Sequence, residues 1–311
     1  MNEVLKRLCK SYGPPANTKA VAAIIEKEIS PFVDEICIDK LGNLIAHKKG
    51  LGKKVWIGAA MDQPCMIVTY APDNGRLKFS VEGILDLRPL SESEVVFEDG
   101  SVGTLLPEHE SAGGESRDYY IRLSDGGRAG IGDVAVLKGS YSENGALLSS
   151  ALHQRAGCSC LIDVIKSIPA EAPGNFCFAF TSHSVAEARG AKTASFDFRP
   201  DIAVSIGTSP ADHRIHPGFG PVLHMRDPAS VTHPDLVAAF ENAASRIHIQ
   251  LQREVASHGF SLISGVVKNG FNLKTASVCL PVAGYQTPDE AADSGDLKDL
   301  SALIIGAISL F

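Results

Sequence analysis

The chain has 311 residues, 36 acidic and 29 basic side chains, a formal net charge of −7 and 44% hydrophobic residues. This composition is typical of a folded chain with a sizeable core and argues against general disorder. The sequence pI is about 5.8, and Lys and Arg form no block. Nucleic acids and anionic membranes are held by clustered basic residues, so neither is expected as a partner.

The N-terminal segment MNEVLKRLCKSYG is amphipathic, but no apolar run with a small-residue cleavage site follows it. No stretch approaches the roughly 18 consecutive apolar residues of a membrane span. We therefore expect a cytoplasmic protein without membrane partners.

The seven cysteines are scattered along the chain and odd in number, as is typical of reduced core thiols in an intracellular protein. The close pair Cys158 and Cys160 lacks a second cysteine pair that would complete a zinc site.

The first part of the chain shows the pattern of a helix followed by strands. Apolar residues at helical spacing predict a helix over 19–29, and alternating residues predict two strands over 35–50 that turn at Gly42. A continuous apolar run over 55–61 predicts a buried strand. The run ends at Asp62, a polar residue at a strand end, where ligands bind in open α/β sheets.

A change of pattern over 67–147 predicts an inserted all-β domain, because short alternating segments are separated there by Gly-, Asp- and Ser-rich turns. Alternation of helices and strands then resumes. The later predictions are a helix over 155–168, strands over 176–183 and 201–208, a helix over 233–254, strands over 263–267 and 276–282, and a C-terminal helix through Leu297 and Ile308. We expect a doubly wound α/β domain formed by residues 1–66 and 148–311.

Six segments resemble, in order and spacing, conserved motifs of one enzyme family: DKLGNLIA at 39–46, GAAMDQ at 58–63, ALHQRAG at 151–157, TSHSVAEARGA at 181–191, GFGPVLHMRD at 218–227 and LPVAGYQTPDE at 280–290. The family is that of the glutamyl aminopeptidases and cellulase M, which are dinuclear metallopeptidases. The resemblance implies a mixed sheet of the zinc-aminopeptidase type with a small inserted β-barrel. It also implies two divalent ions, usually zinc or cobalt, and a glutamate as general base.

The residues that this chemistry requires are replaced. The resemblance implies a histidine at Ala60, the bridging aspartate at His153, the general base at Ser184, a ligand glutamate at Val185, a ligand aspartate at Ser205 and a final histidine at Gln286. Alanine and valine have no atom that binds a metal, and serine and glutamine are weak neutral donors. Serine cannot replace a carboxylate as the base. With Asp62, which is retained, these are the seven vestigial positions of the site. We expect no catalytic residue among them and no cofactor.

Four polar residues stay as candidates for ligand binding: Asp62, His153, Arg155 and His183. An alternative is that Asp62, His153 and His183 hold one divalent ion, zinc or cobalt. Ser184 beside His183 lacks the G-x-S-x-G pattern of a serine nucleophile. His213 and His216 lie in a turn-rich segment and are expected on the surface.

Two functions stay open on the sequence. The first is a pseudoenzyme that binds a peptide or a small molecule in the vestigial cleft or serves in assembly. The second is an active aminopeptidase-like hydrolase with a rebuilt site, in one form holding a single metal ion. The resemblance also implies a homo-oligomer, because relatives assemble through the inserted domain, and residues 108–118 correspond to a loop that they use for contacts between subunits.

Overall fold

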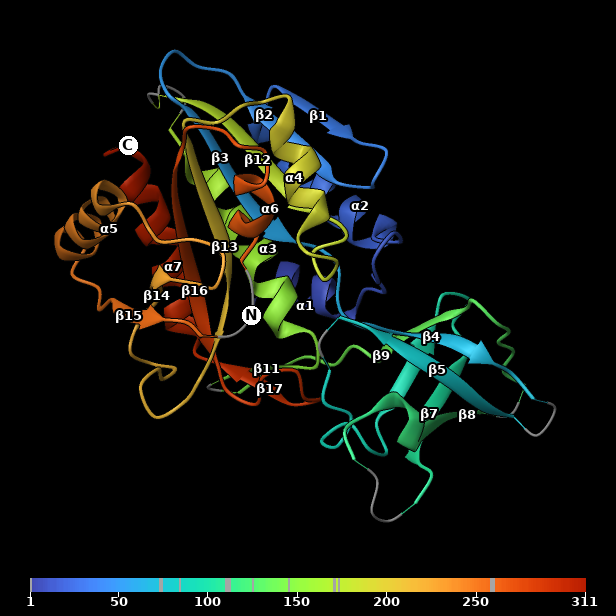
Figure 1. Cartoon of the computed structure of the whole chain (residues 1–311). Helices are drawn as coiled ribbons and strands as arrows, with labels where there is room; N and C mark the ends of the chain where they lie inside the picture. Colours follow the sequence, from blue (N-terminus) through green and yellow to red (C-terminus); the bar gives the residue numbers. More distant parts are fainter. Residues whose placement is uncertain are drawn as a thin grey trace.

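The computed structural model describes residues 2–72, 75–83, 85–109, 113–124, 126–144, 146–169, 172, 174–257 and 261–311. Its larger domain is built on an eight-stranded sheet of order β1-β2-β12-β3-β13-β16-β14-β15 (Figure 1). The strands are β1 (Glu35–Ile38), β2 (Leu44–Lys48), β12 (Asn175–Thr181), β3 (Lys54–Ala60), β13 (Ile202–Pro210), β16 (Lys274–Val282), β14 (Val222–Arg226) and β15 (Gln252–Val255). The four central strands are parallel, and β14 pairs with β16 in the antiparallel sense.

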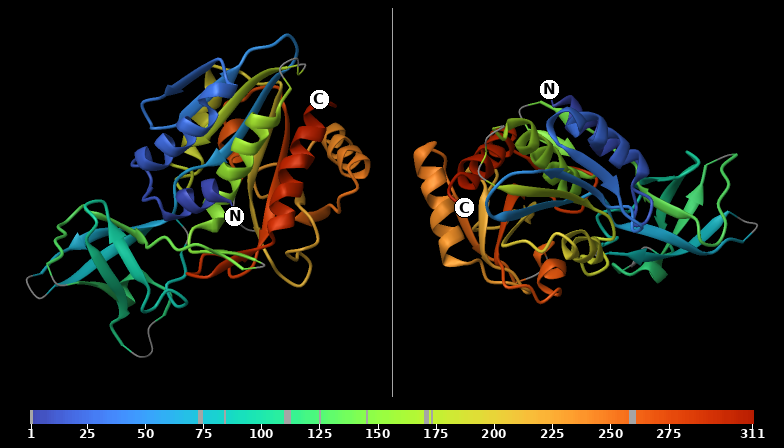
Figure 2. Two further views of the ribbon diagram at one scale, coloured as in Figure 1. Left: turned by 180° about the vertical axis from the view of Figure 1, so that it is seen from behind. Right: turned by 90° about the horizontal axis from the view of Figure 1, so that it is seen from above.

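Helices cover both faces of this sheet (Figure 2). One face carries α1 (Glu3–Lys10), α2 (Lys19–Ile29), α3 (Leu152–Ser167), α5 (Pro234–Arg246) and α7 (Ser294–Ile308). The other face carries the shorter helices α4 (Arg189–Phe196) and α6 (Ile263–Val267). In β12 the phenylalanines at 176, 178 and 180 face the first layer, and Cys177 and Ala179 face the second, as the two-residue period of a strand requires. The predicted doubly wound mixed α/β fold is confirmed.

A closed six-stranded barrel lies at one end of the large sheet (Figure 1). In barrel order its strands are β4 (Cys65–Tyr70), β5 (Arg76–Glu82), β8 (Tyr119–Leu123), β7 (Val102–Pro107), β6 (Glu94–Phe97) and β9 (Val134–Leu137). It encloses a hydrophobic core of its own. The expected small β-barrel is therefore present. Of the predicted contact loop 108–118, residues 110–112 lie outside the described part of the chain.

The chain returns from the barrel through a small sheet beside the larger domain. Its strands are β10 (Ser142–Glu143), β11 (Leu147–Ser149) and β17 (Glu290–Ala292). Strand β17 pairs with β11 in the antiparallel sense, and Glu290 lies opposite Ser149. The small sheet thus places the Glu290 carboxylate, which comes late in the chain, beside the start of α3.

Two sequence predictions are corrected. Residues 263–267 form helix α6 instead of a strand, because a five-residue apolar run has no period that distinguishes the two. The predicted helix 233–254 ends at Arg246, and its last part is strand β15. The backbone of His248 is left-handed, with φ of 59°, and such a residue ends a helix.

Contacts around Asn43 explain part of the retained motif pattern. Asn43 is fully buried. Its amide nitrogen donates to the backbone oxygen of Gly190 at 3.1 Å, and its amide oxygen accepts from the backbone nitrogen of Ser182 at 2.8 Å. A Cβ added to Gly190 would lie 1.9 Å from the backbone oxygen of Ser182. The side chain of Asn43 therefore ties the end of β12 to the start of α4, and only glycine fits between them.

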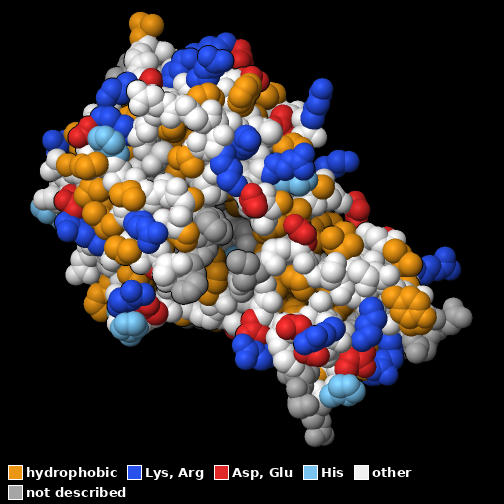
Figure 3. Space-filling view, viewed as in Figure 1, with side chains coloured by type: hydrophobic (Ala, Val, Ile, Leu, Met, Phe, Trp, Pro, Cys, Tyr) orange, Lys and Arg blue, Asp and Glu red, His pale blue; other side chains and the backbone are white. Residues whose placement is uncertain are grey.

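Charged side chains of both signs lie on the visible face of the molecule. On the face shown in Figure 3, basic and acidic side chains are interspersed. None of the helices in the described part of the chain combines the length and the apolar character that a membrane crossing needs.

Candidate functional site

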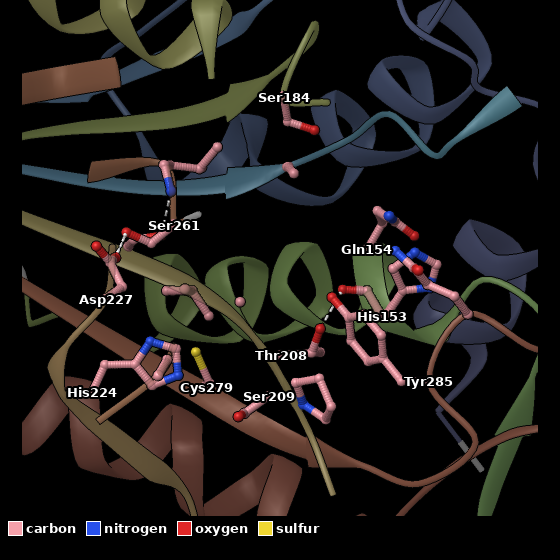
Figure 4. A pocket seen from close by; sticks show the side chains of 18 of the residues that line it. His153, Gln154, Ser184, Thr208, Ser209, His224, Asp227, Ser261, Cys279 and Tyr285 are labelled. Carbon is pink, nitrogen blue, oxygen red and sulfur yellow. Dashed lines mark hydrogen bonds between the residues drawn. The ribbon is translucent and has the colours of Figure 1, made fainter. Parts of the chain in front are cut away.

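A pocket of about 570 Å³ lies at the carboxyl ends of the central strands (Figure 4). This is where ligands bind in open α/β sheets. Six of the seven vestigial positions named from the sequence line the pocket, and Asp62 does not: the six are Ala60, His153, Ser184, Val185, Ser205 and Gln286. The fold therefore brings together positions spread over more than 200 residues of the chain.

Glu290 holds two of these residues in place. Its carboxylate is fully buried. One oxygen accepts from the backbone nitrogen of His153 at 2.9 Å, and the other accepts from the backbone nitrogen of Gln286 at 2.6 Å. The His153 Nδ1 lies 2.5 Å from the second oxygen, and the imidazole contacts the ring of Tyr285 with centroids 5.1 Å apart. The buried Glu290 side chain thus joins the start of α3 to the segment after β16.

Asp62 is also fully buried, but it does not line the pocket. Its two oxygens lie 2.9 and 3.0 Å from the backbone nitrogen of Ser184, which donates to them, and the nitrogen of Val185 is at 3.5 Å. Burial raises the pKa of Asp62, and the hydrogen bonds from Ser184 and Val185 work in the opposite direction. Asp62 therefore positions the loop after β12.

The buried Arg155 joins α3 to the end of α1. Its guanidinium donates to the backbone oxygens of Leu8 at 3.1 Å and Ser11 at 3.3 Å, and to Oε1 of Gln63 at 2.7 Å. It does not line the pocket. Of the four residues predicted to bind a ligand, the structure places only His153 at the pocket wall, because Asp62 and Arg155 are used inside the fold.

The alternative metal ligands are not gathered. His183 is half-buried, has a left-handed backbone with φ of 55° and does not line the pocket. Among the residues that the structure describes, no three His, Cys, Asp or Glu side chains are placed to hold a metal ion. Asp62, His153 and His183 therefore do not form the predicted alternative site in this structure. His213 and His216 are exposed, as expected.

Comparison with known proteins identifies the family. The model of the family described as M42 glutamyl aminopeptidase matches residues 128–303. A putative aminopeptidase of Acetivibrio thermocellus is 31% identical, and the match covers 99% of this chain and 98% of that protein. This chain belongs to the M42 glutamyl aminopeptidase family.

Two solved structures of peptidases share the fold. An aminopeptidase from the archaeon Desulfurococcus kamchatkensis superposes with a TM-score of 0.92 at 22% identity, over 99% of this chain and 94% of that one. The TET1 peptidase of Pyrococcus horikoshii superposes with a TM-score of 0.87 at 25% identity, over 98% of each chain. That peptidase is described as able to assemble into a tetrahedron or a large octahedral shell.

Sequence reasoning missed a second group of polar residues in the pocket of this M42 family member. His224, Glu254 and Cys279 come from β14, β15 and β16, and all three line the pocket. Nearby, Ser261 donates to the buried carboxylate of Asp227 at 2.5 Å. Strand β14 was not predicted, and Cys279 was interpreted as a core thiol. The available signal was a histidine within the apolar segment PVLHM, but the sequence does not show which strands lie beside it.

The burial of Asp62 leads to a prediction about pH. Because its pKa is higher in the folded chain than in the unfolded one, the folded state binds more protons above pH 4, and Asp62 contributes less stability as the pH rises. We therefore expect the free energy of unfolding of Asp62→Asn minus that of the wild type to become more positive between pH 4 and pH 8. The gain is about 1.4 kcal/mol for each unit by which the pKa is raised. Urea denaturation across this range measures it, and a pH-independent difference would contradict the prediction.

Proposed function

We propose that this M42 family member has lost the dinuclear metal centre and binds a peptide or small molecule in the 570 Å³ pocket. The observation that carries the proposal is the identity of the six vestigial residues, which meet in one cavity. The volume lies within the range of about 300–1,000 Å³ for small-molecule sites. The closely similar fold explains why the cavity persists without the residues that the family's chemistry requires.

The side chains at the vestigial positions do not fit a pair of divalent ions. Ala60 and Val185 have no donor atom. The Ser205 hydroxyl accepts from the backbone nitrogen of Leu262 at 3.3 Å, and the His153 imidazole faces Glu290. Zinc and cobalt sites are built from imidazole, carboxylate or thiolate ligands in a fixed geometry. Instead, these residues line the pocket with side chains that are uncharged or that already contact another protein group.

The first test combines metal analysis with an activity assay. We expect protein purified without chelator to hold zinc, cobalt or manganese well below one ion per chain. We also expect no turnover of a panel of aminoacyl reporter substrates when these metals are added. His153→Ala and the exposed control His213→Ala should leave the metal content unchanged.

One result would overturn the proposal. Near-stoichiometric metal, with turnover that His153→Ala abolishes and His213→Ala retains, would make the single-metal hydrolase the better function. Binding is measured on the same preparation as a rise in melting temperature with dipeptides and amino-acid amides, because a ligand that binds only the folded state stabilises it.

We also propose that the chain forms a homo-oligomer. The support is the fold shared with the TET1 peptidase of Pyrococcus horikoshii and two large apolar side chains on the barrel, Tyr70 and Ile131, which are 58% and 74% exposed. Light scattering of the purified chain tests this proposal, and a mass equal to one chain at micromolar concentration would contradict it.

A further inference from the structure

Three chemically reactive side chains lie side by side on neighbouring strands of the sheet. Val222 of β14 is opposite Cys279 of β16, and His224 follows on the same face two residues later. On its other side, His224 is opposite Glu254 of β15. Side chains in such direct and diagonal cross-strand positions are close enough to contact each other. The register therefore aligns a thiol, an imidazole and a carboxylate across three strands.

The contacts confirm this alignment. The His224 Nε2 lies 3.1 Å from an oxygen of the Glu254 carboxylate, and the hydroxyl of Ser209 donates to the same oxygen. The sulfur of Cys279 points toward the His224 ring (Figure 4). Cys279 and His224 are only 3% and 8% exposed, but both line the pocket. The Glu254 carboxylate, which accepts from Ser209, thus lies beside an imidazole that faces a thiol (Figure 4).

Gly207 leaves the thiol open toward the cavity. It is the neighbour of Cys279 on β13 and lines the pocket. A Cβ added there would lie 3.7 Å from the Cys279 sulfur, so a side chain at this position would cover the thiol. Cys279 also packs against the buried Ile215 and Val222.

The local charges make the His224 imidazole a stronger proton acceptor. Burial lowers the pKa of His224, but the Cys279 thiol and the Glu254 carboxylate raise it more, so that the pKa lies above its usual value. Burial raises the pKa of Glu254, whereas the hydrogen bonds from His224 and Ser209 and the charge of Arg214 lower it. A cationic imidazole stabilises a neighbouring thiolate. Burial raises the pKa of the Cys158 and Cys160 thiols to about 12, and neither residue lines the pocket.

We propose that Cys279, His224 and Glu254 form a nucleophilic thiol centre for small acyl compounds, with Cys279 as the nucleophile, His224 as its base and Glu254 as the residue that positions His224. A thiol, a base within reach and a third group that orients the base are the arrangement of covalent acyl-transfer sites. This inference goes beyond the proposed function, since a ligand can bind in the pocket without reacting.

The chemistry balances without a metal or a redox partner. Cys279 transfers its proton to His224, and its sulfur forms a bond to the carbonyl carbon of an ester or amide. The bond from that carbon to the leaving group breaks, and the leaving group takes the proton from His224. A water molecule then gives a proton to His224 and its oxygen to the acyl carbon, and the carbon–sulfur bond breaks. The departing sulfur takes the proton back from His224, so the carboxylic acid leaves and the Cys279 thiol and the neutral imidazole are restored.

The first experiment measures thiol reactivity in the full chain. Iodoacetamide labelling is followed by peptide mass spectrometry. The internal control is Cys37, which is exposed to the reagent. Partial burial of its thiol and the charge of Asp39 raise the pKa of Cys37. At pH 6 we expect Cys279 to react on the order of 10-fold faster than Cys37, because the His224 imidazole faces its sulfur and can take its proton. In His224→Gln this advantage should disappear. Equal rates for both cysteines in the wild type would overturn the proposal.

The second experiment tests acyl transfer with p-nitrophenyl acetate. We expect an acetyl group on Cys279 and release of p-nitrophenolate that falls on the order of 100-fold in Cys279→Ala, whereas Cys37→Ala keeps the wild-type rate. Acetylation only at other residues, or full activity in a folded Cys279→Ala, would overturn the proposal. Neither result bears on metal content or on reversible ligand binding, so the proposed function is tested separately.

Discussion

Gly190→Ala is expected to lower the free energy of unfolding by about 3 kcal/mol or more, although alanine is the better helix former. Helix propensity alone would favour the substitution by about 1 kcal/mol. The added Cβ, however, would lie 1.9 Å from the backbone oxygen of Ser182 and 2.5 Å from the amide oxygen of Asn43. Both atoms belong to one hydrogen-bonded unit that joins β12 to α4. The clash must therefore move backbone, and the steric cost exceeds the propensity gain.

The matched control is Gly207→Ala, a glycine in β13 whose added Cβ would meet its nearest atom, the Cys279 sulfur, at 3.7 Å. That distance is an ordinary van der Waals contact, so we expect a change of less than about 1 kcal/mol. Urea denaturation of both variants, monitored by circular dichroism, gives the comparison. If Gly190→Ala were as stable as Gly207→Ala, the close approach of α4 to β12 would not be essential to the fold.

Sequence patterns predicted the layers of this fold because the relevant signals are local. The helix predicted over 19–29 has the same first and last residues as α2, and the strand predicted over 176–183 contains most of β12. The errors arose where the local signal was short. The apolar run 263–267 was too brief to show a period, and β15 followed a helix without a proline or a glycine between them. Strand β14 has only five residues, and its neighbours come from later in the chain.

The candidate site was predictable only where a motif located it. The resemblance named seven positions, and six of them line one pocket, because motif order and spacing are readable along a chain. The same reasoning placed Asp62 and Arg155 at a ligand, whereas both contact protein groups inside the fold. Whether a buried polar residue faces a cavity or a backbone amide depends on which way the chain turns after the strand, and periodicity does not encode this turn.

Cys279, His224 and Glu254 show a further limit of sequence reasoning. Their proximity depends on the strand order β16-β14-β15, on the antiparallel pairing of β14 with β16 and on the register of that pair. Neither the order nor the register follows from local propensity. A cysteine within an apolar strand is usually a core thiol, and only the open side at Gly207 distinguishes this one.

Glu290→Ala is expected to lower the free energy of unfolding by about 4 kcal/mol, because it removes the partner of several buried groups at once. The backbone nitrogens of His153 and Gln286 would lose their acceptor, and the imidazole of His153 would lose its carboxylate. These groups come from α3 and from the segment after β16, so the substitution should also separate two walls of the pocket. We expect reversible binding of any pocket ligand to weaken together with stability.

Glu94→Ala provides the control for removing a paired glutamate. Glu94 lies 2.9 Å from the Lys138 ammonium, but these side chains are 56% and 49% exposed, and an exposed pair of this kind contributes at most about 1 kcal/mol. Denaturation of the two variants separates the effects of burial and charge. A cost for Glu290→Ala no larger than that for Glu94→Ala would mean that water or a rearranged loop replaces the lost carboxylate. In that case His153 and Gln286 would not depend on Glu290 for their places in the pocket wall.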